Sequence, residues 1–154
     1  MRDHNTIPIL VADDDLDDCE MIREALTESR LLNELQFVHD GEALIKTLHD
    51  KWAQSQDGQN LMPGLILLDL NMPKMDGREV LTELKKHPHL YQIPVIVLTT
   101  SQAEEDIVRS YNLGANSFIT KPIEFESLVQ VMRDVGRYWF EIVALPNCAK
   151  KVTK

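Results

Sequence analysis

The sequence predicts an α/β fold in which a doubly wound, five-stranded parallel sheet, of strand order 2-1-3-4-5, is covered by helices on both faces. Short apolar runs alternate strictly with segments of helical period along the chain. The apolar runs are nearly continuous, as they are in strands that are buried on both faces. Because β-α crossovers are right-handed, this alternation places helices on both sides of one parallel sheet.

The elements are expected in strict order, strand before helix. The expected strands are Pro8 to Ala12, Leu35 to Val38, Leu65 to Asp69, Val95 to Thr99 and Ser117 to Thr120. The expected helices are Leu16 to Ser29, Gly41 to Trp52, Gly77 to His87, Ala103 to Asn112 and Glu124 to Phe140. The polar segment from Ala53 to Asn60 has no apolar period and is predicted to be a loop or an extended end of the second helix, of which an exposed connector is favoured. The predicted strand order is that of flavodoxin.

Capping and turn residues support these boundaries. Asp15 precedes the first helix, and Asp is favoured at a helix N-cap. Pro73 and Gly77 are turn signals between the third strand and the third helix. The run His87-Pro88-His89 is interpreted as the end of the third helix rather than as a metal site.

Carboxylates stand where two of the predicted strands end. Asp69 follows the third apolar run, and Asp13 and Asp14 follow the first. Because open α/β sheets bind ligands beyond the carboxyl ends of their strands, these side chains are expected to gather at one edge. Such a cluster repels itself unless it binds a proton or a cation, and its hard oxygen ligands suit Mg²⁺. The sequence therefore predicts a magnesium site that includes Asp69.

A hydroxyl and an ammonium complete the arrangement. The fourth strand ends in Thr99-Thr100-Ser101, and the fifth ends in Lys121-Pro122. A carboxylate that attacks phosphorus, with a metal ion and a lysine that neutralise the phosphoryl oxygens, is the set of groups that phosphoryl transfer needs. The pattern favours phosphoryl chemistry at Asp69.

These ordered motifs resemble the receiver domain of two-component response regulators over roughly Ile7 to Phe140. The resemblance implies that Asp69 is the phospho-acceptor and that Mg²⁺ is held by Asp14, Asp69 and the backbone carbonyl of Asn71, with Asp13 acting through water. It also implies that Thr99 and Phe118 are switch residues and that Lys121 pairs with the phosphoryl group. A cis peptide bond before Pro122 and a switching face on the fourth helix, fifth strand and fifth helix belong to the same expectation.

Within that family the chain looks like the stand-alone regulators that act with bacterial phytochromes, notably cyanobacterial ones. The segments that carry this likeness are Ile93 to Ser101, Ser110 to Ser117 and Tyr138 to Val143. The likeness implies a sensor histidine kinase as phosphoryl donor and a histidine phosphotransfer protein as a possible acceptor. No enzyme activity beyond self-phosphorylation and autodephosphorylation is expected.

Three rival functions remain as alternatives. A phosphatase with an Asp nucleophile needs a second acid two residues on, where this chain has Asn71, which cannot transfer a proton. A flavodoxin-like electron carrier needs amide and hydroxyl donors where this chain has acids. The third rival is a degenerate interaction domain that keeps the acids as helix caps and turns over no phosphate.

Composition restricts the remaining classes. The chain has 154 residues, 44% of them hydrophobic, and is expected to be a single domain over 1–154 with a C-terminal helix extension and tail from about residue 138. Its net charge of −9 and the lack of a basic stripe disfavour nucleic-acid binding. Cys19 and Cys148 fit no metal or disulfide spacing. We expect a cytoplasmic protein with no membrane contact, because no leader and no span-length apolar run are found.

The last predicted helix is apolar on two faces, which suggests self-association. Its core-facing stripe is expected at Leu128, Met132, Val135 and Trp139. The second face then holds Val129, Phe140 and Val143, with Gly136 allowing close approach. An exposed patch of this kind is commonly covered in a symmetric homodimer, here with Phe140 near its centre. The alternative is that the tail from Glu141 to Pro146 covers the patch within one chain.

Overall fold

A computed structural model describes residues 7–29, 33–55, 61–100 and 103–142, and confirms the predicted sheet. Five parallel strands pair in the order β2-β1-β3-β4-β5. The strands are β1 (Ile9–Ala12), β2 (Leu35–Val38), β3 (Leu65–Leu68), β4 (Val95–Thr99) and β5 (Ser117–Thr120). Every residue of β1, β3 and β4 is buried, as expected of strands covered on both faces.

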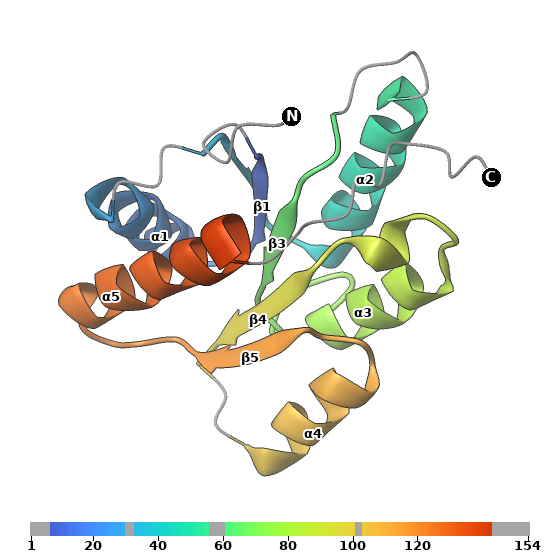
Figure 1. Ribbon diagram of the computed structural model, residues 1–154. Coiled ribbons are helices and arrows are strands. Elements are labelled where there is room, and N and C mark those ends of the chain that lie inside the picture. Colours follow the sequence, from blue (N-terminus) through green and yellow to red (C-terminus); the bar gives the residue numbers. More distant parts are fainter. Residues whose placement is uncertain (1–6, 30–32, 56–60, 101–102, 143–154) are drawn as a thin grey trace.

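Helices follow the strands in alternation, as predicted (Figure 1). They are α1 (Leu16–Glu28), α2 (Gly41–Ser55), α3 (Gly77–Lys86), the short η2 (Leu90–Gln92), α4 (Glu104–Asn112) and α5 (Phe125–Gly136). The π-helical segment η3 (Arg137–Ile142) continues α5. No helix within the described part of the chain combines the length and the apolar character that a membrane span requires.

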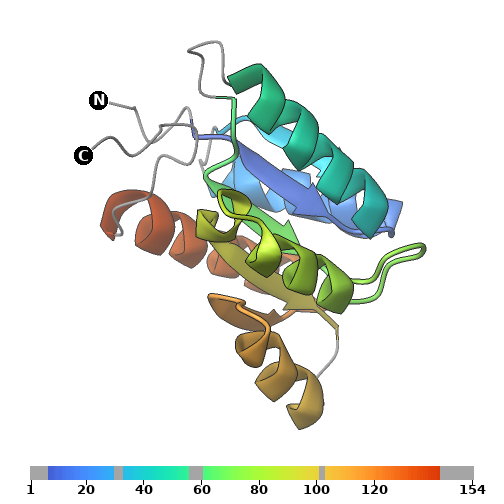
Figure 2. The same cartoon turned by 90° about the vertical axis from the view of Figure 1, so that its right-hand side faces the viewer.

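Two cores lie on opposite faces of the sheet, and alternate residues of β1 point into them. Figure 2 shows the sheet between its two helical layers. One core joins the sheet to α1 and α5 through Ile9, Val11, Ile22, Leu26, Leu128 and Met132. The other joins it to α2 and α3 through Leu10, Ala12, Leu44, Leu48, Val80 and Leu84. Outside these layers, α4 lies beside the edge strand β5 and buries only Ser110 along its length.

Aspartate side chains cap two of the helices. Asp15 accepts hydrogen bonds from the backbone N–H groups of Asp17 and Asp18, which confirms it as the N-cap of α1. Asp76 does the same for α3 through Arg78 and Glu79. Both caps follow loops that leave the carboxyl edge of the sheet, so they fix the directions of α1 and α3 beside the acidic residues.

The prediction of an exposed patch on the last helix is wrong for the residues that the structure describes, because they are buried. Phe140 is only 3% exposed, and Val129 and Gly136 are buried with it. The reason is that α5 packs against both the sheet and α1, so its buried sector is wider than one helical stripe. Residues 53–55 of the predicted connector continue α2, so the connector is wrong for them and the extended end of the second helix is right. Val143 and residues 56–60 lie outside the described residues.

Candidate functional site

Three carboxylates gather at the carboxyl edge of the sheet, as the strand ends predicted. Asp13 and Asp14 follow β1, and Asp69 follows β3. One oxygen from each lies within 4.8 Å of the others. Asp13 and Asp69 are buried, whereas Asp14 is exposed. The cluster is therefore open to solvent on one side and closed by the sheet on the other.

Lys121 enters this cluster from the end of β5. Its Nζ donates hydrogen bonds to Asp13 Oδ2 at 2.6 Å and to Asp18 Oδ2 at 2.8 Å, and lies 3.8 Å from Asp69 Oδ2. The side chain of Lys121 is only 6% exposed. The backbone N–H of Lys121 donates to the carbonyl of Thr99 at 2.7 Å, which fixes where the lysine leaves the sheet.

The pKa values in the pocket reflect burial and an excess of negative charge. Burial raises the pKa of the Asp13 carboxyl to about 6, although the hydrogen bond from Lys121 acts in the opposite direction. Burial also disfavours the charged form of Lys121, but its hydrogen bonds to Asp13 and Asp18 outweigh this and raise the pKa of the ammonium. One ammonium thus faces Asp13, Asp18 and Asp69, with Asp14 beside them, and a bound cation would relieve the remaining repulsion.

Thr99 ends β4 with a buried hydroxyl that has no partner among the described residues. The residue is fully buried, and its Oγ1 makes no hydrogen bond to any described residue. A buried hydroxyl without a partner is costly in a folded protein, which suggests a role at the site. On the neighbouring strand β5, Phe118 pairs with Val97, two residues before Thr99, and it is half-buried and packs on the core that holds α2 and α3. The backbone N–H of Phe118 donates to the hydroxyl of Tyr111 on α4, at 3.1 Å.

Hydrogen bonds within the loop between β3 and α3 hold Asp69 in place. The N–H of Asn71 donates to Asp69 Oδ1 at 3.3 Å, so the Asn71 backbone lies next to the carboxylate. The backbone carbonyl of Asn71 can bind a metal ion only if it lies close to this carboxylate. Gly77 approaches the same segment closely, and its N–H donates to the Leu70 carbonyl at 2.9 Å. Lys74 has a φ of 67°, an uncommon value for a residue other than glycine, so the turn is tightly constrained.

Two features of the site differ from the sequence-based expectations. The peptide bond between Lys121 and Pro122 is trans, not cis, which is the isomer that an X–Pro bond ordinarily prefers. The contact between Asp18 and Lys121 was not anticipated, although Asp18 stands within the same acidic run as Asp13 and Asp14. Ser101, which the motif after β4 includes, lies outside the described residues.

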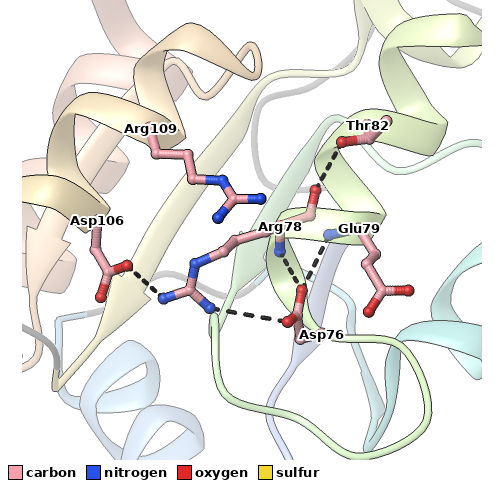
Figure 3. Close-up of a pocket in the computed structure, with 6 residues that line it drawn as sticks. All are labelled: Asp76, Arg78, Glu79, Thr82, Asp106 and Arg109. Atoms are coloured by element: carbon pink, nitrogen blue, oxygen red, sulfur yellow. Dashed lines mark hydrogen bonds and ion pairs between the residues drawn. The ribbon is translucent and has the colours of Figure 1, made fainter.

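A charged groove lies between α3 and α4, beside the site. It is lined by Asp76, Arg78, Glu79, Thr82, Asp106 and Arg109 (Figure 3). Arg78 forms a close ion pair with Asp106 and approaches Asp76, the cap of α3, at 3.9 Å. Arg78 therefore links the helix that follows the Asp69 loop to α4, which otherwise has few contacts with the body of the fold.

The residues present fit a magnesium ion and phosphoryl chemistry. The carboxylates of Asp14 and Asp69 are the hard oxygen ligands that Mg²⁺ prefers, and the exposed side of the cluster leaves room for its waters. Asp69 can attack phosphorus, and the unpartnered hydroxyl of Thr99 and the ammonium of Lys121 can contact the oxygens of a transferred group.

Comparison with known sequences matches the same region. The sequence model of the family described as "Response regulator receiver domain" matches residues 9–133. This range includes all of the pocket residues and all five strands.

Relatives extend the similarity to nearly the whole chain. Response regulator Rcp1 of Synechocystis sp. is 40% identical over 148 residues, which cover 95% of this chain and 99% of Rcp1. The crystal structure of the phosphorylated cyanobacterial phytochrome response regulator RcpA has a TM-score of 0.81 at 39% identity, and covers 92% of this chain and 99% of RcpA. The Mn²⁺-bound form of Rcp1 has a TM-score of 0.78 at 39% identity, with 91% and 99% of the two chains covered.

Proposed function

The chain belongs to the response regulator receiver family, and from this premise we propose that it is a stand-alone regulator that accepts a phosphoryl group on Asp69. The observation that carries the proposal is the meeting of Asp69, Lys121 and the unpartnered hydroxyl of Thr99 at one edge of the sheet. The similarity to Rcp1, which covers 99% of that response regulator, also supports the proposal.

In the proposed reaction Asp69 is the nucleophile. A carboxylate oxygen of Asp69 forms a bond to phosphorus while the bond from phosphorus to a histidine nitrogen of the donor kinase breaks. The histidine nitrogen keeps the bonding electron pair and takes up a proton. Lys121 holds its positive charge 3.8 Å from the Asp69 carboxylate and can neutralise the oxygens of the arriving group.

Mg²⁺ is the metal that we assign to this site, held by Asp14, Asp69 and the Asn71 carbonyl, with Asp13 acting through water. When bound, it supplies positive charge to the phosphoryl oxygens. The acid cluster supports a divalent cation here, and so does the similarity to Rcp1, which has been crystallised in a Mn²⁺-bound form.

Thr99 and Phe118 are proposed to carry the signal to the face made by α4, β5 and α5. A phosphoryl group offers Thr99 Oγ1 the acceptor that it lacks in the resting chain. Movement of Thr99 toward that acceptor would free space next to Phe118, which is only half-buried and can turn inward. Because the Phe118 N–H also bonds Tyr111, a shift of β5 reaches α4 directly.

The test is phosphorylation by acetyl phosphate with Mg²⁺, followed by intact mass. Wild type should gain one phosphoryl group and Asp69→Asn none, because the amide is not a nucleophile but keeps the shape of the side chain. Asp15→Asn is the matched control, since Asp15 lies in the acidic run but serves as the cap of α1, a role that Asn also fills. A phospho-adduct on Asp69→Asn would refute the assignment. A wild type that takes no phosphoryl group would favour an interaction domain, and steady release of phosphate from phosphate esters would favour a phosphatase.

The donor that we propose is a sensor histidine kinase of the phytochrome type, acting in the cytoplasm, with a histidine phosphotransfer protein as a possible further acceptor. The similarity to RcpA, a cyanobacterial phytochrome response regulator, supports the phytochrome pairing. Two exposed apolar side chains flank the pocket and suit docking of an apolar helix face: Leu16 opens α1 and is 67% exposed, and Ile123 follows the Lys121 loop and is 96% exposed.

A homodimer through the α4, β5 and α5 face is also proposed, with different contacts from those first expected. Val129 and Phe140 are buried within the chain, so they are not available. Val108 and Tyr111 of α4 are about half exposed and take their place. Light scattering on wild type and Val108→Asp, with and without acetyl phosphate, tests this: dissociation by the charged residue is expected, and a wild type that is monomeric in both states refutes the dimer.

A further inference from the structure

Asp18 makes a contact that the proposed reaction does not use. Lys121 Nζ donates to Asp18 Oδ2 at 2.8 Å, across 103 residues of sequence, and this bond joins α1 to the loop after β5. The lysine is nearer to Asp18 than to Asp69, which lies at 3.8 Å. In the resting chain the ammonium is therefore held by Asp13 and Asp18, not by the nucleophile.

The ammonium has a limited number of donors for these partners. It carries three N–H groups, and hydrogen bonds to Asp13 and Asp18 engage two of them. A phosphoryl group on Asp69 would bring about two negative charges and three strong acceptor oxygens to the same place. One N–H group is not engaged by Asp13 or Asp18, so the phosphoryl oxygens would compete with these two carboxylates for the ammonium.

Of the two partners, Asp18 is the one that can be released. Asp13 is 2% exposed at its side chain and also accepts the backbone N–H of Asp15 at 3.0 Å, so it is fixed from two sides. The Asp18 side chain is 27% exposed, and Lys121 is its one hydrogen-bond donor among the described residues. A carboxylate with that exposure can be hydrated by bulk solvent when the lysine leaves, whereas the buried Asp13 carboxylate is closed off from bulk solvent.

We propose that Asp18 is a positioning residue that holds Lys121 in the resting state and competes with the phosphoryl group on Asp69 for it. This inference rests on the proposed function, because it assumes that Asp69 carries the phosphoryl group. Asp18 thereby weakens the binding of a phosphoryl group at Asp69, both by occupying the lysine and by adding a negative charge close to it.

The probe is beryllium fluoride, which bonds to a carboxylate oxygen and imitates a phosphoryl group without transfer. With Mg²⁺ present throughout, its dissociation constant is measured by calorimetry for wild type, Asp18→Asn, Asp18→Glu and Asp17→Asn. Asp18→Asn keeps the size of the side chain and loses its charge, so we expect binding about threefold tighter or more. Asp18→Glu restores the carboxylate and should bind close to wild type.

Asp17→Asn is the matched control. It removes the same charge from the same turn of α1, but Asp17 is exposed and makes no ion pair with Lys121. Its affinity for beryllium fluoride should match wild type. If Asp17→Asn binds as tightly as Asp18→Asn, a general charge effect explains the result and the specific competition is refuted.

A spectroscopic readout separates positioning from a merely structural role. The ¹H–¹⁵N signal of the Lys121 ammonium, identified by its loss in Lys121→Ala, should shift when beryllium fluoride is added to wild type. In Asp18→Asn the resting signal should already differ from wild type at the same pH.

The outcomes distinguish this inference from the proposed function. If acetyl phosphate phosphorylates wild type but Asp18→Asn binds beryllium fluoride no more tightly, the competition is refuted and the proposed function stands. If wild type accepts neither beryllium fluoride nor a phosphoryl group, the proposed function is refuted and the competition with it. Unchanged thermal unfolding of the variants excludes loss of the fold as a cause.

Discussion

The backbone of Gly77 lies directly against the carbonyl oxygen of Asp69. A Cβ placed on Gly77 would stand 2.6 Å from that oxygen and 2.8 Å from the Cα of Leu70. Both neighbours are backbone atoms, which cannot turn aside as a flexible side chain can. The start of α3 and the segment that carries the nucleophile are therefore in direct contact, and the position of one depends on the other.

Gly77→Ala should disturb the site through this contact. The added methyl group forces the Asp69 segment away from α3, and we expect a loss of about 2 kcal/mol or more in the free energy of unfolding. Urea denaturation measures this loss, and acetyl phosphate labelling should show slower phosphorylation at concentrations where the variant is folded. A stability and a labelling rate equal to wild type would contradict the contact.

Thr99→Val should weaken the phosphoryl-bound state without destabilising the resting state. Because Thr99 Oγ1 has no partner in the described structure, its removal should leave the free energy of unfolding unchanged or raise it by up to about 1 kcal/mol. The extra thermal stability that beryllium fluoride gives to wild type should shrink in the variant. Ser110→Ala is the control, since Ser110 Oγ is also buried and unpartnered but lies in α4; its response to beryllium fluoride should stay normal.

Asp14→Ala should weaken magnesium binding. Asp14 contributes an exposed carboxylate to the cluster, and its loss removes a charged ligand without opening a cavity in the core. Isothermal calorimetry should show a Mg²⁺ affinity lower by about tenfold or more, as for loss of a charged ligand contact of about 1.4 kcal/mol. Asp15→Asn is again the control, and equal Mg²⁺ affinity in Asp14→Ala would remove Asp14 from the ligand set.

Phe140→Ala should destabilise the single chain. Phe140 is buried in the core that α1 and α5 form with the sheet, so truncation is expected to cost about 3–5 kcal/mol in the free energy of unfolding. Tyr138→Ala, at an exposed position of the same segment, should cost far less. Urea denaturation at two protein concentrations tests this; a loss that disappears on dilution would instead place Phe140 between two chains.

Protonation of His87 should lower the free energy of unfolding in acid. Burial, with the neighbouring His49 and His89, lowers the pKa of His87 in the folded chain below its ordinary value of 6.5. The unfolded chain therefore binds the proton first, so the stabilising contribution is complete above pH 6.5 and is lost as pH falls below it. The neutral ring also accepts the N–H groups of His89 and Leu90 at Nδ1, which protonation would prevent.

His87→Asn is the corresponding test. The Asn oxygen can accept the same N–H groups and does not titrate. Between about pH 7 and pH 5 the urea midpoint should fall less in His87→Asn than in wild type, and equal decreases would remove His87 as the cause. Glu83 and Lys86 border the same surface, so the comparison is made at constant ionic strength.

The strand order, the five β-α pairs and the gathering of Asp13, Asp14, Asp69 and Lys121 were all predicted from the sequence. They could be, because strands buried on both faces leave continuous apolar runs, and residues that follow parallel strands must meet at one edge. The N-cap at Asp15 could also be predicted from the sequence, since an N-cap depends on a few neighbouring residues.

Only the tertiary structure decided which side chains meet across the chain. Asp18 reaches Lys121 because α1 packs beside α5 and its first turn lies near the end of β5. The spacing of residues in the sequence does not reveal this contact. Phe140 is buried because α5 packs against both the sheet and α1, whereas the prediction of one apolar stripe assumed that the helix packs against the sheet alone. Local pattern determines the elements and their ends, but the width of a buried face and the partner of a charge depend on how the finished helices pack.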